Sequence, residues 1–455
     1  MMGTGVKQKE MESTCWLLDA ALGREGWWEQ LEAAGAPLCE PLSLGGPVGS
    51  AGDQVRVSFL WRDPEGSELE STYVRVYIDV NSVTDHHSFE PQSLQRVPGT
   101  DVWYWQVDLP ANWRGSYCYI PVRQEQLPPH ILQENEANPK QQQQAQRAWW
   151  QSISGRAMAD PLNPCVHRNA WGAYSALHLP AAPDQSAWLG EDSTRAEPGH
   201  DPARSAQQEW QWHSALLSTS RTVWLYQTGT GSSLPLVILL DGRRWAQEMP
   251  IYNALDKETE RSRLPAARYL FVDSVSGAQR SRELACDDVF WNAVVQELLP
   301  DVALAHKFIL KPETTVVAGQ SLGGLAAMYA ALNYPHVFGA VVSQSGSFWW
   351  PYVELLHAAP GQPCLRKPGA QGLLAEKLDN GIISSPVPLR IFMEVGSRED
   401  VMIDVNESMR NALVAAGHQV HFQQFEGGHD GICWRGGLLE GLAVLLPEQA
   451  ESRNS

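Results

Sequence analysis

One serine in this 455-residue chain lies in a turn that is typical of nucleophilic catalysis. Ser321 follows the β-branched run 314–318 and precedes the alanine- and leucine-rich run 325–332, and these runs predict a buried strand and a helix. Glycines on both sides complete the G-x-S-x-G pattern of a nucleophile elbow, in which a sharp turn exposes the hydroxyl. We therefore predict that Ser321 is the nucleophile and that the N–H of Leu322 stabilises the oxyanion. The alternative is a glycine-rich turn with an incidental serine.

A nucleophilic serine needs a general base and a carboxylate that orients this base. His429 follows the expected last strand, 420–425, and two glycines allow its loop to turn back over the sheet. We predict that His429 is the base. Glu399 and Asp400 follow another expected strand and lie between the serine and the histidine in the sequence. Either one could be the acid, with Glu399 preferred, and the other would then be a solvated loop residue.

The second oxyanion donor of such a fold comes from the loop after an earlier strand. Here that loop begins at Asp241, directly after the apolar run 236–240. The N–H of Gly242 or of Arg243 is the candidate donor. A plain turn without a catalytic role is the alternative.

Strand and helix patterns alternate from residue 210 onward, which predicts a doubly wound, mostly parallel sheet with the order of an α/β hydrolase. We place this catalytic domain at 206–448. The expected strands are 221–226, 236–240, 269–272, 314–318, 340–342, 389–393 and 420–425, and the expected helices are 290–299, 322–333 and 406–416.

The amino-terminal part has a different pattern of apolar and polar residues. Residues 1–45 are expected to be a helical segment, and short alternating runs separated by turns predict an all-β, immunoglobulin-like sandwich over 46–127. Its expected strands are 55–61, 73–78, 102–107 and 117–120. The polar, proline-rich stretch 128–205 is interpreted as a linker with one short helix.

A formal net charge of −18 disfavours nucleic acid and anionic membranes as general partners. The apolar runs have the length of strands, so no membrane insertion is expected, and the absence of a secretory signal pattern in residues 1–12 favours the cytoplasm. Seven scattered cysteines without C-x-x-C spacing argue against a disulfide framework or a zinc site. The pair His86-His87 has no third ligand at a usable spacing, so no metal site and no cofactor are predicted. The oligomeric state is left open.

Several motifs in order along the chain resemble those of the enterochelin esterase family. In the carboxy-terminal part they are 239–242, 280–284, 290–291, 296–300, 318–324, 343–350, 427–430 and 433–437; in the amino-terminal part they are 59–64, 99–105 and 113–117. The resemblance covers nearly the whole chain. It implies hydrolysis of the serine trilactone of ferric catecholate siderophores, with release of iron inside the cell. The family's acid follows Gly-x-Arg, which corresponds to Glu399 here, and the adjacent Asp400 is a departure from the pattern.

The substrate that the resemblance implies is an anion of about three negative charges with flat aromatic faces, so its site needs guanidinium groups and aromatic walls. The predicted substrate-binding residues are Arg244, Arg280, Arg282, Arg435, Trp349, Trp350 and Trp434. Ordinary packing is the alternative role of the three tryptophans.

Two other functions are also compatible with the sequence. One is a generic carboxylesterase or acyltransferase of the same fold, which would show no preference for the trilactone over a simple aryl ester. The other is a non-catalytic binding protein, against which the order of serine, acid and histidine argues.

Overall fold

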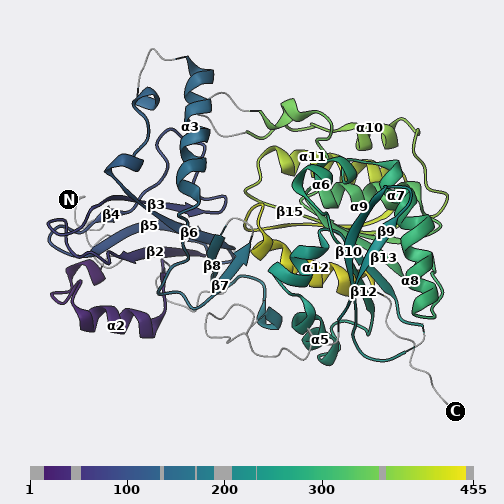
Figure 1. The fold of residues 1–455 in the computed structure, drawn as a ribbon, viewed down its shortest axis with the longest axis horizontal. Helices are drawn as coiled ribbons and strands as arrows, with labels where there is room; N and C mark the ends of the chain where they lie inside the picture. The colour runs from purple at the N-terminus through teal and green to yellow at the C-terminus, as the bar shows by residue number, and fades with distance from the viewer. Residues whose placement is uncertain are drawn as a thin grey trace, which may run out of the picture. The chain divides into compact units, whose positions relative to one another are not determined.

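The computed structural model describes residues 15–42, 53–133, 138–169, 172–188, 207–231, 233–357 and 365–446. The chain forms two compact units, of which the first consists chiefly of residues up to Asp184 and the second chiefly of residues from Gln185 onward (Figure 1). Among the described helices, none combines the length and the apolar character that crossing a membrane requires.

The first unit contains two four-stranded antiparallel sheets, with the orders β1-β2-β5-β4 and β3-β6-β8-β7. Its elements are η1 (Cys15–Leu18), α2 (Glu25–Ala34), β1 (Leu38–Pro41), β2 (Gln54–Arg62), β3 (Tyr73–Val80), β4 (Gln95–Arg96), β5 (Val102–Pro110), β6 (Arg114–Arg123), η2 (Gln124–Gln126), η3 (His130–Gln133), α3 (Pro139–Ser154), β7 (Val166–Asn169) and β8 (Gly172–His178). The four strands expected from the sequence lie within β2, β3, β5 and β6.

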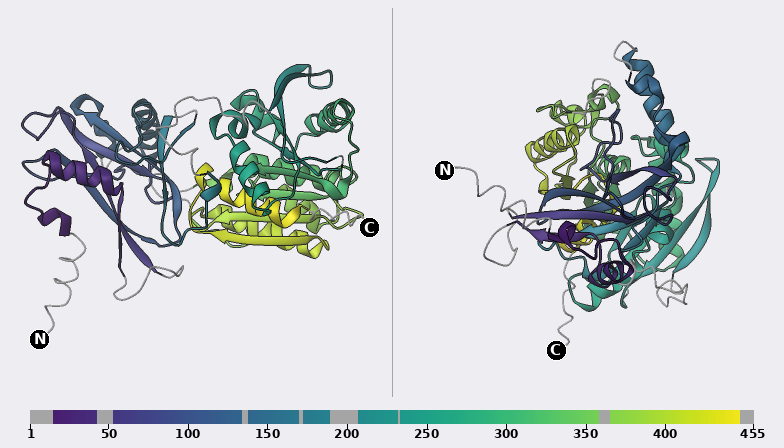
Figure 2. Two further views of the ribbon diagram at one scale, coloured as in Figure 1. Left: turned by 90° about the horizontal axis from the view of Figure 1, so that it is seen from below. Right: turned by 90° about the vertical axis from the view of Figure 1, so that its left-hand side faces the viewer.

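Residues of both sheets share one hydrophobic core. Val57 and Phe59 of β2, Ile78 of β3, Trp103 of β5 and Tyr119 of β6 are buried in the same cluster. Figure 2 shows the strands that carry them, in purple and blue, from two further directions. Burial of such large apolar side chains is the main favourable contribution to folding of this unit.

The stretch 128–205, which the sequence analysis interprets as a linker, is in its described part mostly structured. Helix α3 begins after Asn138, whose side chain accepts a hydrogen bond from the N–H of Lys140. Trp149 and Ile153, one helical turn apart, pack in a buried cluster with Ile120 of β6. The polar, glutamine-rich start of this helix hid its apolar face from the sequence analysis. Strands β7 and β8 then complete the second sheet.

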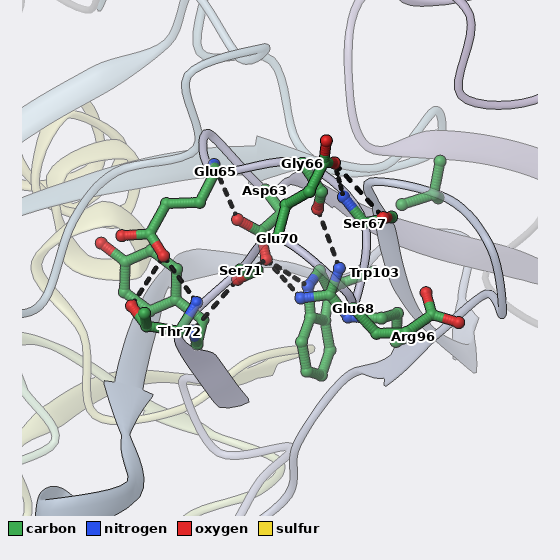
Figure 3. A network of polar contacts seen from close by, with 12 residues as sticks. Asp63, Glu65, Gly66, Ser67, Glu68, Glu70, Ser71, Thr72, Arg96 and Trp103 are labelled. Carbon is green, nitrogen blue, oxygen red and sulfur yellow. Dashed lines mark hydrogen bonds and ion pairs between the residues drawn. The ribbon is translucent and has the colours of Figure 1, made fainter.

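The turn after β2 is fixed by a polar network around a fully buried carboxylate (Figure 3). Asp63 accepts hydrogen bonds from the N–H of Glu65 at 2.9 Å, from the hydroxyl of Ser71 at 2.7 Å and from the indole of Trp103 at 3.2 Å. It also pairs with Arg96, whose guanidinium lies 4.4 Å from the centre of the Trp103 ring. A buried charge that is paired and hydrogen-bonded in this way holds one turn conformation.

A second buried carboxylate makes the stability of the first unit depend on pH. Burial raises the pKa of Asp160 from its ordinary 3.8 to about 6, although Tyr117 and Tyr119 donate hydrogen bonds to it at 2.8 and 3.3 Å. The folded protein therefore holds this proton more tightly than the unfolded chain. The resulting stabilisation is complete below about pH 4 and is lost as the pH rises through about 6.

We expect Asp160→Asn, which is neutral at every pH, to remove this dependence and to stabilise the protein at pH 7 by roughly 3 kcal/mol at most. Denaturant unfolding of the first unit at pH 4.5 and 7.5, followed by circular dichroism, measures the effect. Asp108→Asn is the control, because Asp108 is exposed and pairs with Arg56 at the surface. An equal pH dependence in the parent and in Asp160→Asn would contradict the prediction.

The second unit contains an eight-stranded sheet of order β16-β15-β14-β13-β11-β12-β10-β9. Its strands are β9 (Gln208–Ser214), β10 (Thr219–Gln227), β11 (Leu236–Leu239), β12 (Arg268–Val272), β13 (Thr315–Gln320), β14 (Ala340–Gln344), β15 (Arg390–Gly396) and β16 (Gln419–Phe425). Neighbouring strands pair in parallel along the order β16-β15-β14-β13-β11-β12, and β10 and β9 add antiparallel pairs at one edge. The prediction of a mostly parallel central sheet is therefore confirmed.

Helices cover both faces of this sheet (Figure 1). The described helices and short helical turns of this unit are η4 (Ser186–Trp188), η5 (Arg244–Glu248), α5 (Tyr252–Glu260), α6 (Gly277–Glu283), α7 (Asp288–Ala293), η6 (Val294–Leu298), α8 (Leu299–Ala305), η7 (Pro312–Thr314), α9 (Leu322–Asn333), η8 (Val353–Leu356), α10 (Leu373–Asp379), α11 (Val401–Ala415) and α12 (Gly431–Leu445). Helices α7 to α11 share one hydrophobic core with the sheet. Helix α12 packs on the other face, where Gly441 closely approaches Phe392 of β15. Because the central strands are buried on both faces, their sequences are continuously apolar.

The loops at the carboxyl ends of the parallel strands share an unusual backbone conformation. Asp241, Val275, Ser321, Ser345 and Asp400 follow β11, β12, β13, β14 and β15 within a few residues, and each has a positive φ of 45–61°. This conformation is costly for residues other than glycine and is concentrated at functional sites. The loops at the carboxyl ends of these strands are therefore the candidate location of the active site.

Candidate active site

Ser321 forms the corner between β13 and α9, with φ 57° and ψ −121°. Its N–H donates to the carbonyl oxygen of Gln344 at 3.0 Å, which ties the corner to the neighbouring strand β14. The corner needs glycine at position 319, because a Cβ there would overlap the backbone of Gly323. The structure thus places the Ser321 hydroxyl at a strained strand-to-helix turn, as the G-x-S-x-G pattern predicts.

The first residue of α9 is Leu322, so its N–H is among the backbone donors at the helix start that no helical carbonyl accepts. These donors, together with the helix dipole, favour negative charge beside the serine. The Ser321 hydroxyl also lies 3.3 Å from the hydroxyl of Ser347, a buried residue after β14.

His429 is paired with Glu399. The distance from Nδ1 of His429 to Oε2 of Glu399 is 2.6 Å, and the carboxylate side chain is only 1% exposed. Its other oxygen, Oε1, accepts the hydroxyl of Ser345 at 2.6 Å and the N–H of Gly396 at 2.8 Å. A histidine whose Nδ1 donates to a carboxylate presents Nε2 as a base.

The alternative acid, Asp400, occupies a different position. It precedes the first residue of α11, has a positive φ of 45°, and is exposed. The structure places Glu399 at hydrogen-bond distance from His429 and Asp400 at the exposed start of α11.

The loop after β11 lies beside the elbow. Gly242 packs against the backbone of β12, where a Cβ would lie 2.5 Å from the nitrogen of Val272. The side chain of Asp241 reaches toward α9, since a Cβ on Gly323 would lie 3.4 Å from Asp241 Oδ2. The backbone N–H groups of Gly242 and Arg243 are therefore carried by a loop that contacts the helix start, which is where a second oxyanion donor belongs.

Arg280, one of the predicted substrate-binding arginines, is already paired. Its guanidinium binds both oxygens of Asp241 at 2.7 and 2.6 Å, and Ser274 donates to the same carboxylate at 2.7 Å. Burial would raise the pKa of Asp241, but the hydrogen bonds and the charge of Arg280 hold it below its ordinary value. This bidentate pair fixes the loop after β11, so the structure assigns Arg280 a role in shaping the site.

Arg435, another of the predicted substrate-binding residues, is buried within α12 with 1% exposure. Its Nε donates to Oε1 of Gln185 at 2.6 Å, and its guanidinium lies 5.1 Å from the centre of the Trp188 ring. Helix α12 is apolar on most of its surface, so the sequence does not show that Arg435 faces inward.

Trp434, which was predicted to bind substrate, is also buried, with 4% exposure. Its ring stands edge-to-face with His429 at 4.6 Å, and its indole N–H donates to the hydroxyl of Ser345 at 2.9 Å. The structure therefore gives Trp434 a supporting place behind the histidine.

Four predicted substrate-binding residues remain accessible. Arg244 is half-buried and lies 5.8 Å from the Trp434 ring, while Arg282 is exposed on α6. Trp349 and Trp350 are half-buried in the segment after β14, with their rings 6.0 Å apart. These side chains offer positive charge and aromatic surface to solvent.

Gln344, the last residue of β14, and Ser345, which follows it, were not among the predicted site residues. Gln344 donates to Glu394 at 2.6 Å and to the carbonyl oxygen of Trp434 at 2.7 Å, and Ser345 donates to Glu399. Their signal was a run of polar residues, 343–347, at the end of an otherwise apolar strand. Buried polar side chains at the catalytic edge of a sheet are seldom there for packing alone.

Comparisons with known proteins agree in both units. A family model described as "Enterochelin esterase, N-terminal" matches residues 56–188, and one described as "Putative esterase" matches residues 214–445. The iron(III) enterobactin esterase of Dickeya dadantii is 46% identical, with 95% of this chain and 96% of the relative covered. That of Escherichia coli K12 is 40% identical, with 93% and 96% covered.

Solved structures give the same result. The ferric enterobactin esterase of Salmonella typhimurium matches with a TM-score of 0.76 at 39% identity, covering 92% of this chain and 98% of that chain. The enterobactin esterase of Shigella flexneri, crystallised in the presence of enterobactin, matches with a TM-score of 0.75 at 40% identity, covering 93% and 98%. From the elbow serine, the paired histidine and carboxylate, and this agreement over nearly the full length, we conclude that the chain belongs to the iron(III) enterobactin esterase family.

Proposed function

We propose that this protein is a serine esterase that hydrolyses the trilactone backbone of ferric enterobactin and similar ferric catecholate siderophores. The observation that carries the proposal is the 46% identity to an iron(III) enterobactin esterase over 95% of the chain, which includes both units. The elbow serine and the His429–Glu399 pair supply the chemistry that an esterase needs.

In the proposed mechanism, the Ser321 oxygen attacks an ester carbonyl carbon while Nε2 of His429 takes the serine proton. Glu399 holds the imidazole through Nδ1 and stabilises its positive charge. The N–H of Leu322, with that of Gly242 or Arg243, stabilises the oxyanion. The C–O bond to the leaving serine alkoxide breaks as His429 returns the proton, and a water molecule then hydrolyses the acyl-enzyme by the same steps.

The substrate is recognised through its charge and its aromatic faces. Arg244 and Arg282 are the proposed cationic contacts, and Trp349 and Trp350 are the proposed aromatic walls. Arg244 adds its charge beside the Trp434 ring and therefore near His429. A neutral aryl ester needs none of these contacts, so substrate preference separates the proposal from a generic esterase.

The test is incubation of the purified protein with ferric enterobactin, iron-free enterobactin and p-nitrophenyl butyrate at equal concentrations. Chromatography with mass spectrometry should show linear and monomeric dihydroxybenzoylserine products, with kcat/KM for the siderophore far above that for the aryl ester. A protein that cleaves only the aryl ester would be a generic esterase, and one that cleaves neither would contradict the proposed activity.

We also propose that the protein acts in the cytoplasm and that the two sheets of its first unit form an immunoglobulin-like sandwich. The first proposal is supported by Cys39, Cys118 and Cys286, which are thiols in the described part of the chain, as is usual in reducing compartments. The second is supported by the core that residues of both sheets share.

A further inference from the structure

We propose that Ser345 is a positioning residue of the esterase, which fixes Glu399 in the orientation that His429 requires, and that the Trp434 indole orients Ser345 in turn. This inference rests on the proposed roles of Glu399 and His429. It gives a function to the Ser345 hydroxyl, which neither attacks the substrate nor abstracts a proton.

Ser345 is built into the sheet edge with little freedom. It directly follows β14, is fully buried, and has a positive φ of 46°. Its N–H donates to the carbonyl oxygen of Glu394 on β15 at 2.7 Å. A non-glycine residue persists in this conformation only where its surroundings enforce it, so the direction of its side chain is set by the fold.

The directions of the hydrogen bonds follow from the chemistry of the partners. The Trp434 indole can only donate, so at 2.9 Å it gives its proton to the Ser345 oxygen. An ionised carboxylate can only accept, so the one hydroxyl proton of Ser345 goes to Oε1 of Glu399 at 2.6 Å. The three side chains therefore form a one-way chain from Trp434 through Ser345 to Glu399.

This chain decides which oxygen of Glu399 faces the histidine. Oε1 is occupied by the Ser345 hydroxyl and by the N–H of Gly396, which leaves Oε2 for His429 at 2.6 Å. A carboxylate held by two donors on one oxygen cannot rotate without breaking both bonds. His429 is thereby kept with its proton on Nδ1 and with Nε2 directed away from the acid.

The Glu399 carboxylate is buried, with its side chain 1% exposed, so its oxygens depend on hydrogen-bond donors within the fold. Ser345, Gly396 and His429 lie at 2.6, 2.8 and 2.6 Å from these oxygens. Loss of the Ser345 hydroxyl would remove one donor from a buried oxygen and loosen the orientation of the carboxylate.

Two further contacts hold Trp434 in place. Its carbonyl oxygen accepts a hydrogen bond from the side-chain amide of Gln344 at 2.7 Å, and its ring packs edge-to-face with the His429 ring, with the ring centres 4.6 Å apart. Gln344 and Ser345, two consecutive residues at the carboxyl end of β14, thus connect this strand to the start of α12 and to Glu399 on the loop after β15.

The test compares Ser345→Ala with Ser343→Ala. Ser343 is two residues earlier on β14 and is equally buried, but its hydroxyl has no hydrogen-bond partner in the described structure, so its removal breaks no bond. We expect Ser345→Ala to lower kcat about 10- to 100-fold with little change in KM, since a hydrogen bond to a charged group is lost. Ser343→Ala should stay within about threefold of the parent. Equal rates of the two variants would overturn the proposal.

A double-mutant cycle with Glu399→Gln separates positioning from scaffolding. If Ser345 acts through Glu399, adding Ser345→Ala to Glu399→Gln should cost less than about threefold in kcat; a further loss as large as that in the parent background would overturn the proposal. Trp434→Phe, which keeps the ring and removes only the indole N–H, should lower kcat about 2- to 10-fold. It provides the same test if Ser345→Ala does not fold, and parental kcat in a folded Trp434→Phe would equally overturn the proposal.

These outcomes also distinguish this inference from the proposed triad. A Glu399→Gln enzyme at the parental rate would contradict the role of Glu399 and with it the role of Ser345. A slow Glu399→Gln enzyme together with a fast, folded Ser345→Ala enzyme would contradict the role of Ser345 alone.

Discussion

Ser321→Ala should reduce kcat for ferric enterobactin by about 10⁶-fold, to the background that binding and the oxyanion donors alone support. The hydroxyl is the attacking atom, and alanine supplies no replacement for it. Alanine can keep the corner, because it adds no atom beyond the Cβ that serine already has. His429→Ala should cause a loss of the same order, since the serine is a poor nucleophile while it keeps its proton.

Steady-state hydrolysis of ferric enterobactin and p-nitrophenyl butyrate measures both losses, and circular dichroism with a melting curve checks the fold. The Ser343→Ala variant described above serves as a control for removing a buried hydroxyl from the same edge of the sheet. Near-parental rates of a folded Ser321→Ala or His429→Ala enzyme would show that the bond is broken by other groups.

Glu399→Gln should lower kcat about 10⁴-fold, somewhat less than loss of the serine or histidine. Glutamine has nearly the same shape, but its amide brings donors to a place where His429, Ser345 and Gly396 all need an acceptor. The histidine would then lose the partner that holds its tautomer and stabilises its charge.

Asp400→Asn is the matched control, because it makes the same chemical change at the neighbouring residue. Asp400 is exposed, and asparagine has nearly the same shape as aspartate, so we expect less than about a threefold change in kcat. A larger loss in Asp400→Asn than in Glu399→Gln would contradict the assignment of the acid.

The elbow could be predicted from the sequence because its signals are local. A buried strand, a tight turn with small residues and a helix follow one another within about twenty positions, and each leaves its own pattern. The parallel sheet could also be predicted, since strands covered on both faces are continuously apolar. The local sequence did not decide between Glu399 and Asp400. It depends on how the loop after β15 turns, and neighbouring residues in a loop can point in opposite directions.

Burial that depends on tertiary packing could not be predicted from the sequence. Arg435 and Trp434 are buried in α12, a helix with so few polar residues that no face is marked as buried or exposed. Ser345 was missed because a serine in a glycine- and serine-rich run has no distinctive local pattern. Its importance comes from partners on β15's loop and on α12, which are 54 and 89 residues away in the sequence.

Covalent labelling shows most directly whether Ser321 is the attacking nucleophile of this esterase. Diethyl p-nitrophenyl phosphate should be attacked at phosphorus, with formation of a bond to the Ser321 oxygen and release of one p-nitrophenolate per active site. Peptide mapping by mass spectrometry should find the diethylphosphoryl group on Ser321, with hydrolysis of ferric enterobactin lost in proportion to labelling. A label on another residue, or full hydrolysis by a protein fully labelled at Ser321, would show that Ser321 is not the nucleophile.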